Sequence, residues 1–182
     1  MILHAVVRVL CMRQLGSIDD KLWDSLMRLP SHVEEYRRSS KSLWKTADLS
    51  ASKAQQWTES LEAKETITAL YCRVKLNCMS LTPLDDECLG IGLDVLGATM
   101  NHSCDPNAVC IFEGKGFRVR SLRPILAGEE ITISYTENTL DRSIRQRVLR
   151  ANYFFDCECE KPYFLRSYFK AFLLSPSNPC SH

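Results

Sequence analysis

The chain has 182 residues, of which 45% are hydrophobic and 25% are charged, and its formal net charge is +1. This length and apolar content predict a globular protein of one domain, or one domain with a helical appendage, and exclude wholesale disorder. The balance of 23 basic against 22 acidic residues argues against bulk electrostatic capture of nucleic acid or anionic lipid. No apolar run approaches the roughly 18 residues of a membrane span. We therefore expect no direct nucleic-acid partner and no membrane partner.

Cysteine content and the N-terminal segment indicate the cell compartment. Residues 1–12 are apolar but contain His4 and Arg8, and they lack the basic start and cleavage site of a signal peptide. The nine cysteines are odd in number and irregularly spaced, which favours reduced thiols over a secreted disulfide framework. We expect an intracellular protein of the nucleus, the cytoplasm or both, and we consider some of its thiols as candidate metal ligands.

The first part of the chain, residues 1–76, has the pattern of helices. Residues 2–14 are almost entirely apolar, which predicts a buried helix. Ser17 is the expected N-cap of a second helix, which Pro30 ends.

Two further helical signals follow in the same region. Ser31 with Glu34 has the pattern of a capping box. One long helix is then expected from about Ser52 to Leu76. Its apolar stripe comprises Trp57, Leu61, Ile67, Leu70, Tyr71 and Val74.

Near Asn77 the sequence changes character, because glycine and proline now separate short β-like runs. The runs 109–111 and 117–119 flank residues 113–116 (EGKG), a pattern that predicts a hairpin. A turn at Gly128 is followed by Ile131 and Ile133, which we expect to point inward on alternate positions of a strand.

A last helix is expected from a cap at Thr139 to about Arg150. Its arginines favour a solvated helix face over peptide recognition, and they are Arg142, Arg145, Arg147 and Arg150. These elements predict an α+β fold: a helical region at 1–76, a mixed, loop-rich region at 77–162 and an atypical tail at 163–182.

Three motifs carry the residue types of a functional site. They are NHSCDPN at 101–107, GEEITISY at 128–135 and YFFDCEC at 153–159. Each motif alone has an ordinary structural interpretation: a hydrogen-bonded loop, a turn into a strand, and buried thiols.

In this order and spacing, the motifs resemble the C-terminal half of a SET domain, the fold of protein-lysine methyltransferases, and specifically the SET- and MYND-domain subfamily. The resemblance is strong over about 77–159. It is looser over 1–76, where the subfamily has a helical insert, and absent from the tail. It implies that the helical insert precedes the small-sheet, β-clip-like C-terminal portion of a SET fold.

The resemblance implies methyl transfer from S-adenosylmethionine to a lysine of a protein substrate, histone or non-histone, by a monomer. Tyr135 matches the catalytic tyrosine and Tyr153 a second tyrosine of the lysine channel. The matching cofactor-binding residues are Asn101, His102 (largely by position and backbone), Asn77 and Phe155, whose ring packs against the adenine.

The subfamily also holds a structural zinc with four cysteines, and here the resemblance is incomplete. Cys104, Cys157 and Cys159 match three ligands, but Pro162 stands at the fourth position. Tetrahedral thiolate sites require four ligands. Either Cys180 or His182 completes the site by a fold-back of the tail, or zinc binds weakly or not at all.

Two further features of the subfamily are absent from the sequence. No Gly-x-Gly stretch precedes residue 90, and the Cys-x2-Cys pairs of a MYND finger do not occur. The chain is therefore interpreted as the C-terminal part of a methyltransferase, an incomplete fragment. The alternatives are a catalytically inactive SET-like protein-interaction module and an α+β domain whose cysteines are simply buried.

Overall fold

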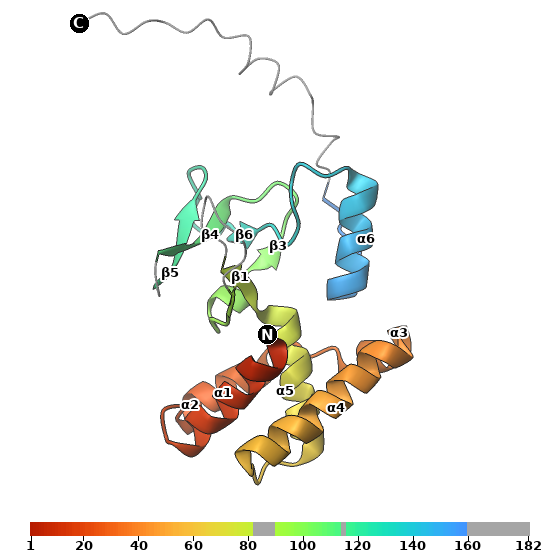
Figure 1. Ribbon diagram of the computed structural model, residues 1–182. Coiled ribbons are helices and arrows are strands. Elements are labelled where there is room, and N and C mark those ends of the chain that lie inside the picture. Colours follow the sequence, from red (N-terminus) through yellow and green to blue (C-terminus); the bar gives the residue numbers. More distant parts are fainter. Residues whose placement is uncertain (82–89, 114–115, 160–182) are drawn as a thin grey trace, which may run out of the picture.

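The computed structural model describes residues 1–81, 90–113 and 116–159. Five helices come first: α1 (Ile2–Gln14), α2 (Asp20–Arg28), α3 (Val33–Ser39), α4 (Lys41–Thr58) and α5 (Lys64–Asn77). Figure 1 shows these helices gathered in one half of the molecule, with the strands and α6 (Arg142–Tyr153) in the other. Helix α5 leads directly from the first half into the second. The predicted helix at 2–14 is confirmed by α1.

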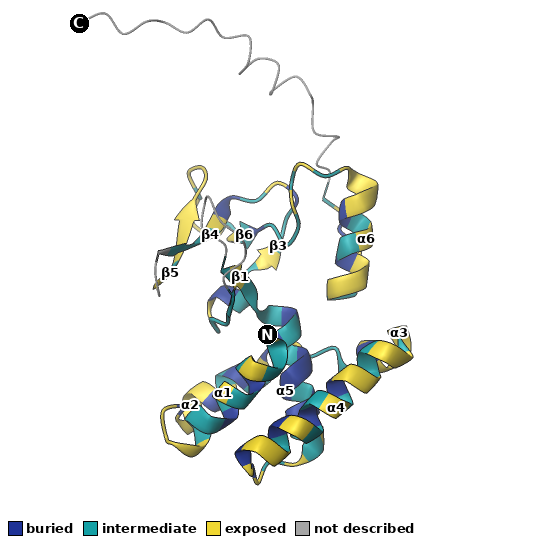
Figure 2. Cartoon of the chain, in the orientation of Figure 1, coloured by how far each residue is buried: buried dark blue, intermediate teal, exposed yellow. Residues whose placement is uncertain are grey.

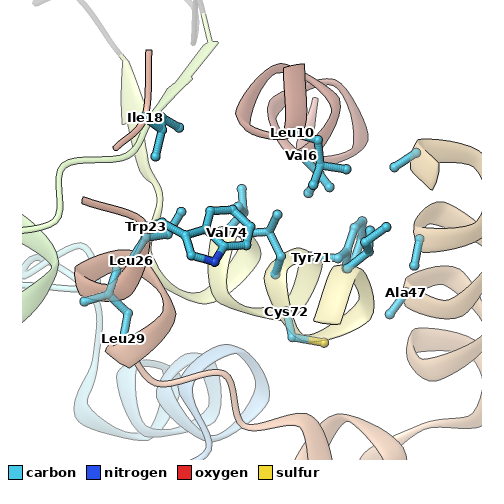
Figure 3. Packing of buried hydrophobic residues seen from close by; sticks show 14 of the residues in the cluster. Val6, Leu10, Ile18, Trp23, Leu26, Leu29, Ala47, Tyr71, Cys72 and Val74 are labelled. Carbon is cyan, nitrogen blue, oxygen red and sulfur yellow. The ribbon is translucent and has the colours of Figure 1, made fainter. Parts of the chain in front are cut away.

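The main hydrophobic core lies among the helices, and α5 is its central element. Figure 3 shows Val6 and Leu10 of α1 pointing toward α5, and Ala47 of α4 beside Tyr71. The alanines on the inner face of α4 are fully buried, so α4 and α5 approach each other closely. Figure 2 shows the resulting distribution of burial: buried residues lie along α5, while the outer faces of α1 and α4 are exposed.

The prediction of one long helix from Ser52 to Leu76 is wrong. Helix α4 ends at Thr58, and Glu59 adopts the left-handed conformation with φ of +50°. The chain then reverses direction and α5 begins at Lys64, so α4 and α5 pack as a pair. Two residues of the predicted stripe lie outside the core as a result. Trp57 is 56% exposed, and Leu61, in the turn, is fully exposed.

The helix starts also differ from the expected caps. Asp19, and not Ser17, caps α2, because its carboxylate accepts a hydrogen bond from the Leu22 amide at 2.7 Å. Helix α3 starts after His32, whose φ is +47°, and no side chain caps it, so the capping box at Ser31 does not form. Helix α2 ends at Arg28, two residues before Pro30, as predicted.

The strands form three two-stranded sheets among the described residues. Strand β1 (Met79–Leu81) pairs antiparallel with β2 (Gly90–Gly92), and β3 (Asn101–His102) pairs parallel with β6 (Thr132–Ile133). The predicted hairpin is confirmed by β4 (Ala108–Glu113) and β5 (Gly116–Ser121).

The segments on either side of β6 depart partly from expectation. The turn at Gly128 is confirmed by its φ of +83°. Ile133 is buried as predicted, but Ile131 is 46% exposed, because the strand starts only at Thr132. Helix α6 is preceded by Asp141 rather than capped by Thr139, and it continues to Tyr153.

Small sheets between helices confirm the α+β class at this coarse level. In the part of the chain that the structure describes, no helix combines the length and apolarity needed to cross a membrane.

The break between α4 and α5 can be tested by glycine substitution. Glu59→Gly should raise the free energy of unfolding by about 0.5–1 kcal/mol, because glycine tolerates the left-handed conformation that glutamate adopts here at a cost. The matched control Gln56→Gly, on the exposed face of α4, should lower it by about 1 kcal/mol. Urea unfolding measures both changes. Equal destabilisation by the two variants would contradict the assigned helix end.

Candidate functional site

A cleft of about 960 Å³ lies between the helical half and the strands. Its walls come from the end of α5, from the loop and strand around Asn101, from the end of β6 and from the end of α6. Five residues that the sequence analysis selected line it, and they are Asn77, Asn101, Tyr135, Tyr153 and Phe155. His102 is not among the described residues that line the cleft. The structure therefore brings parts of all three motifs to one hollow.

The first two motifs are joined by the β3–β6 pair and by the buried side chain of Asn107. The pairing sets His102 opposite Ile133. Asn107 is 2% exposed. Its Nδ2 donates to the Glu130 carbonyl at 2.8 Å and to Glu129 Oε1 at 3.1 Å, and its Oδ1 accepts from the Thr132 amide at 2.9 Å. A buried amide satisfied on every side fixes the relative position of the two motifs.

Two adjacent carboxylates support this junction. Hydrogen bonding from Arg123 is the main cause that lowers the pKa of Glu129 to about 2, with further help from the Leu126 amide and Asn107. Glu130 Oε1 accepts from Asn101 Nδ2 at 2.6 Å. The exposed Asn101 side chain is thereby oriented, and its Oδ1 is the atom left to accept a hydrogen bond from a ligand.

Tyr135 is held at both ends, by His102 of the first motif and by Met100, the residue just before that motif. Its backbone N–H donates to His102 Nδ1 at 3.0 Å, and its hydroxyl donates to the Met100 carbonyl at 2.6 Å. Its ring lies 4.7 Å from that of Tyr153, measured between centroids. Burial raises the pKa of both tyrosines, so both phenols are protonated at neutral pH.

The end of α6 turns two phenylalanines in different directions. Phe154 has a φ of +63°, which ends the helix. Its ring packs edge-on against Tyr36 of α3 with centroids 5.0 Å apart. The next ring, Phe155, lies 6.4 Å from Tyr135 in an edge-on arrangement. Phe154 thus joins α6 to the helical half, while Phe155 belongs to the wall of the cleft.

Asn77 lines the cleft with part of its amide already engaged. Its Nδ2 donates to the Pro30 carbonyl at 2.9 Å and to the Arg73 carbonyl at 2.8 Å. Both amide protons are used, so Asn77 offers a ligand only its Oδ1.

A thiol cluster packs against the aromatic rings of Tyr135, Tyr153 and Phe155. Cys104 Sγ is 3.9 Å from Cys157 Sγ, and Cys159 Sγ is 2.7 Å from Cys157 Sγ. His102 Nε2 is 3.3 Å from Cys104 Sγ, and these two atoms and Cys157 Sγ all lie within 4.8 Å of one another. Burial is the main cause that raises the pKa of the Cys157 thiol to about 12. The structure brings the three predicted cysteines together; Pro162, Cys180 and His182 lie outside the described residues.

His102 stands between the thiol cluster and the aromatic wall. Its ring centroid is 5.4 Å from that of Tyr135 and 5.9 Å from that of Phe155. Burial, and after it the charge of Arg145, lower the pKa of His102 to about 4, so the ring is neutral at pH 7.

The prediction of a solvated arginine face on α6 is wrong for one residue. Arg142, Arg147 and Arg150 are exposed, but Arg145 is only 1% exposed. Its Nε donates to Cys104 Sγ at 3.3 Å, and its Nη1 donates to the Leu140 carbonyl. Sequence reasoning missed this residue, although Arg145 stands four residues before Leu149, which is fully buried on the same helix face.

Comparison with known proteins identifies the family of the chain. The SET domain family model matches residues 16–136. The chain is 38% identical over 133 residues to SET domain and MYND-type zinc finger protein 6 of Schizosaccharomyces pombe. These residues are 73% of the chain and 27% of that protein. It is 35% identical over 89 residues to histone-lysine N-methyltransferase SMYD3 of Mus musculus, covering 49% of the chain and 21% of the relative.

The N-lysine methyltransferase SMYD2 of Sus scrofa is 32% identical over 107 residues, which cover 58% of the chain and 25% of that protein. The fold and the site are those of a chain that contains part of a SET domain. The chain belongs to the SET domain family, and its similar relatives are SET- and MYND-domain proteins. It spans between a fifth and just over a quarter of the length of these relatives.

The buried guanidinium on α6 gives a stability prediction. Arg145→Leu should lower the free energy of unfolding by about 3 kcal/mol, because the Leu140 carbonyl and the Cys104 sulfur each lose a hydrogen bond from a buried charged donor. Arg147→Leu, the exposed control on the same helix, should change it by less than about 0.5 kcal/mol. Urea unfolding compares the two. Similar, small effects of both variants would refute the structural role of Arg145.

Proposed function

We propose that this chain carries the C-terminal portion of a SET catalytic domain, which transfers methyl groups from S-adenosylmethionine to lysine side chains of a protein substrate. The observation that carries the proposal is the cleft, because residues of three separate motifs line it together: Asn77, Asn101, Tyr135, Tyr153 and Phe155. The methyltransferase names of the SMYD3 and SMYD2 relatives support the same reaction class. The chain's own activity, its cofactor and the roles of these residues are parts of the proposal.

The organisation of the chain follows from the same proposal. Residues 1–76 are the helical insert region, residues 77–162 are the C-terminal SET core of β-clip type with a partial cysteine motif, and residues 163–182 are an atypical tail. The chain is then a fragment of a longer enzyme, consistent with the small share of each relative that it covers.

The residues of the cleft fit S-adenosylmethionine chemically. The Asn101 and Asn77 oxygens are acceptors suited to the cofactor's ammonium group. Both amide protons of Asn77 already have partners, and one amide proton of Asn101 is donated to Glu130. Phe155 offers an aromatic face to the adenine, where an offset stack contributes about 1 kcal/mol. When bound, the cofactor supplies an electrophilic methyl group on its sulfonium.

The aromatic wall prepares the lysine for attack. The half-buried rings of Tyr135 and Tyr153 remove water from the channel, and desolvation disfavours the ammonium form of the lysine. The Tyr135 hydroxyl donates its one proton to the Met100 carbonyl, so its oxygen presents lone pairs to the reacting centre. Those lone pairs would orient the methyl group of a bound cofactor through C–H···O contacts.

The thiol cluster fits a structural zinc ion in part. Two sulfurs on one tetrahedral zinc lie roughly 3.8 Å apart, and Cys104 and Cys157 are separated by 3.9 Å. The Arg145 N–H on Cys104 Sγ also suits an anionic thiolate. Three cysteines would hold the ion; Cys180 and His182, the two residues considered for the fourth position, lie outside the described residues. Bound zinc would crosslink the loop at Cys104 to the segment after α6.

The proposal extends to partners and location. The partner is a protein that presents a lysine, histone or non-histone, and the chain acts as a monomer. The near-zero net charge does not favour direct nucleic-acid binding. A location in the nucleus, the cytoplasm or both is consistent with the histone-lysine methyltransferase name of the SMYD3 relative.

Calorimetric titration of S-adenosylmethionine into the folded 182-residue chain tests the cofactor site. We expect saturable binding that Asn101→Ala weakens at least tenfold, about 1.4 kcal/mol, because the oriented oxygen is lost. Asn152→Ala, on the exposed face of α6, is the matched control and should bind as the wild type does. A folded chain without binding would contradict the cofactor site and favour the interaction module.

Tyr135→Phe tests the proposed catalytic role. The kcat for methyl transfer to a lysine peptide should fall at least about tenfold while cofactor affinity stays within twofold, because only the oxygen near the methyl group is removed. Tyr71→Phe removes a hydroxyl from the helical core instead, and it should leave kcat unchanged. Transfer by Tyr135→Phe at the wild-type rate would overturn the role.

A further inference from the structure

The imidazole of His102 connects the thiol cluster with Tyr135 through its two nitrogens. Nδ1 lies 3.0 Å from the backbone nitrogen of Tyr135, and Nε2 lies 3.3 Å from Cys104 Sγ. The ring stands behind the wall of the cleft, within ring-contact distance of Tyr135 and Phe155. Its position is thus suited to acting on the wall and not on a ligand in the cleft.

The contact with Tyr135 determines the tautomer of the ring. A backbone N–H is always a donor, so Nδ1 must offer its lone pair and carry no proton. In the neutral imidazole the proton then resides on Nε2, which faces Cys104 Sγ. His102 therefore donates an N–H···S hydrogen bond to the sulfur.

This tautomer excludes His102 as the missing metal ligand, although its Nε2 lies within 4.8 Å of both thiol sulfurs. Coordination through Nε2 needs a lone pair on that nitrogen, which would move the proton to Nδ1. Two N–H groups, those of Nδ1 and of Tyr135, would then face each other at 3.0 Å. The ring could bind a metal through Nε2 only if its hydrogen bond with the Tyr135 amide were lost.

Cys104 Sγ also accepts a hydrogen bond from a second donor, the buried Nε of Arg145. Two N–H donors on one sulfur form the outer shell that orients a metal-bound thiolate. A thiolate bound to a metal accepts a stronger hydrogen bond than a neutral thiol does. The strength with which Cys104 holds the His102 ring therefore depends on whether the cluster contains a metal.

We propose that His102 is a positioning residue that transmits metal binding at the thiol cluster to Tyr135, with Nε2–H on Cys104 and Nδ1 on the Tyr135 amide. Metal binding strengthens the hold on the ring, and the ring in turn holds the backbone of Tyr135. The methyl-transfer consequence of this coupling rests on the proposed function, but the coupling itself does not.

Nitrogen-15 NMR of the full 182-residue chain tests the proposal without substitution. Long-range correlations of the His102 ring identify the protonated nitrogen during titration with zinc chloride and after removal of zinc with EDTA. We expect a proton on Nε2 in both states, and a shift of the Tyr135 amide resonance that saturates with the same Kd as zinc binding. Three results would each overturn the proposal: metal bound to Nε2, a Tyr135 amide resonance that does not shift with zinc, or a folded chain that binds no zinc.

A matched pair of variants separates the two hydrogen bonds of the His102 ring. In His102→Asn, the carboxamide reaches about as far as Nδ1, so it keeps an acceptor for Tyr135 but not the donor to Cys104. Zinc affinity should fall about 10- to 100-fold, and the Tyr135 amide should no longer respond to zinc. In His102→Gln, the carboxamide reaches as far as Nε2 and keeps the donor to Cys104. Zinc affinity should stay within about threefold while the coupling to Tyr135 is lost.

These outcomes distinguish the coupling from the proposed function. Zinc affinity and the Tyr135 amide shift are measured without S-adenosylmethionine, so they report the coupling even in a chain that binds no cofactor. Equal loss of zinc affinity in both variants, with the chain folded by circular dichroism, would overturn the division of roles. If methyl transfer is present, His102→Gln should lower kcat and leave the KM for S-adenosylmethionine unchanged.

Discussion

The buried amide of Asn107 is the constraint on which the site depends. It bonds Glu129, the Glu130 carbonyl and the Thr132 amide, all more than twenty residues away along the chain. This one side chain therefore aligns the Asn101 loop with the strand that leads to Tyr135. The short β3–β6 pair continues the same alignment. The hydrogen bonds of Tyr135 to His102 and to the Met100 carbonyl build on this alignment.

Two sets of contacts are built on that junction. In the first, the rings of Tyr135, Tyr153 and Phe155 form the wall of the cleft. In the second, His102 and Arg145 converge on the sulfur of Cys104. The wall and the thiol cluster share α6, whose buried face provides Arg145 and Leu149 and whose end provides Tyr153. The chemistry and its structural support are thus parts of one packed unit.

Local signals predicted some elements well and others poorly. The apolar helix α1, the β4–β5 hairpin and the turn at Gly128 follow from residue patterns within a few positions, and all three are confirmed. The break between α4 and α5 is not signalled by glycine or proline, because Glu59 adopts the left-handed conformation there. It arises because α5 is buried on most sides and α4 must fold back to cover it. Hydrophobic periodicity alone indicates an apolar stripe on a helix, and it does not indicate where the chain reverses direction.

By itself, the sequence determined which residue types are present and in what order. This order was sufficient to indicate the family, the chemistry proposed for Asn101, Tyr135 and the cysteines, and the α+β class. The tertiary structure alone decided how each side chain is used. The burial of Arg145, the engaged amide of Asn77 and the tautomer of His102 depend on partners between 33 and 47 positions away. Hydrogen-bond direction and burial are properties of such distant pairs, so no local pattern encodes them.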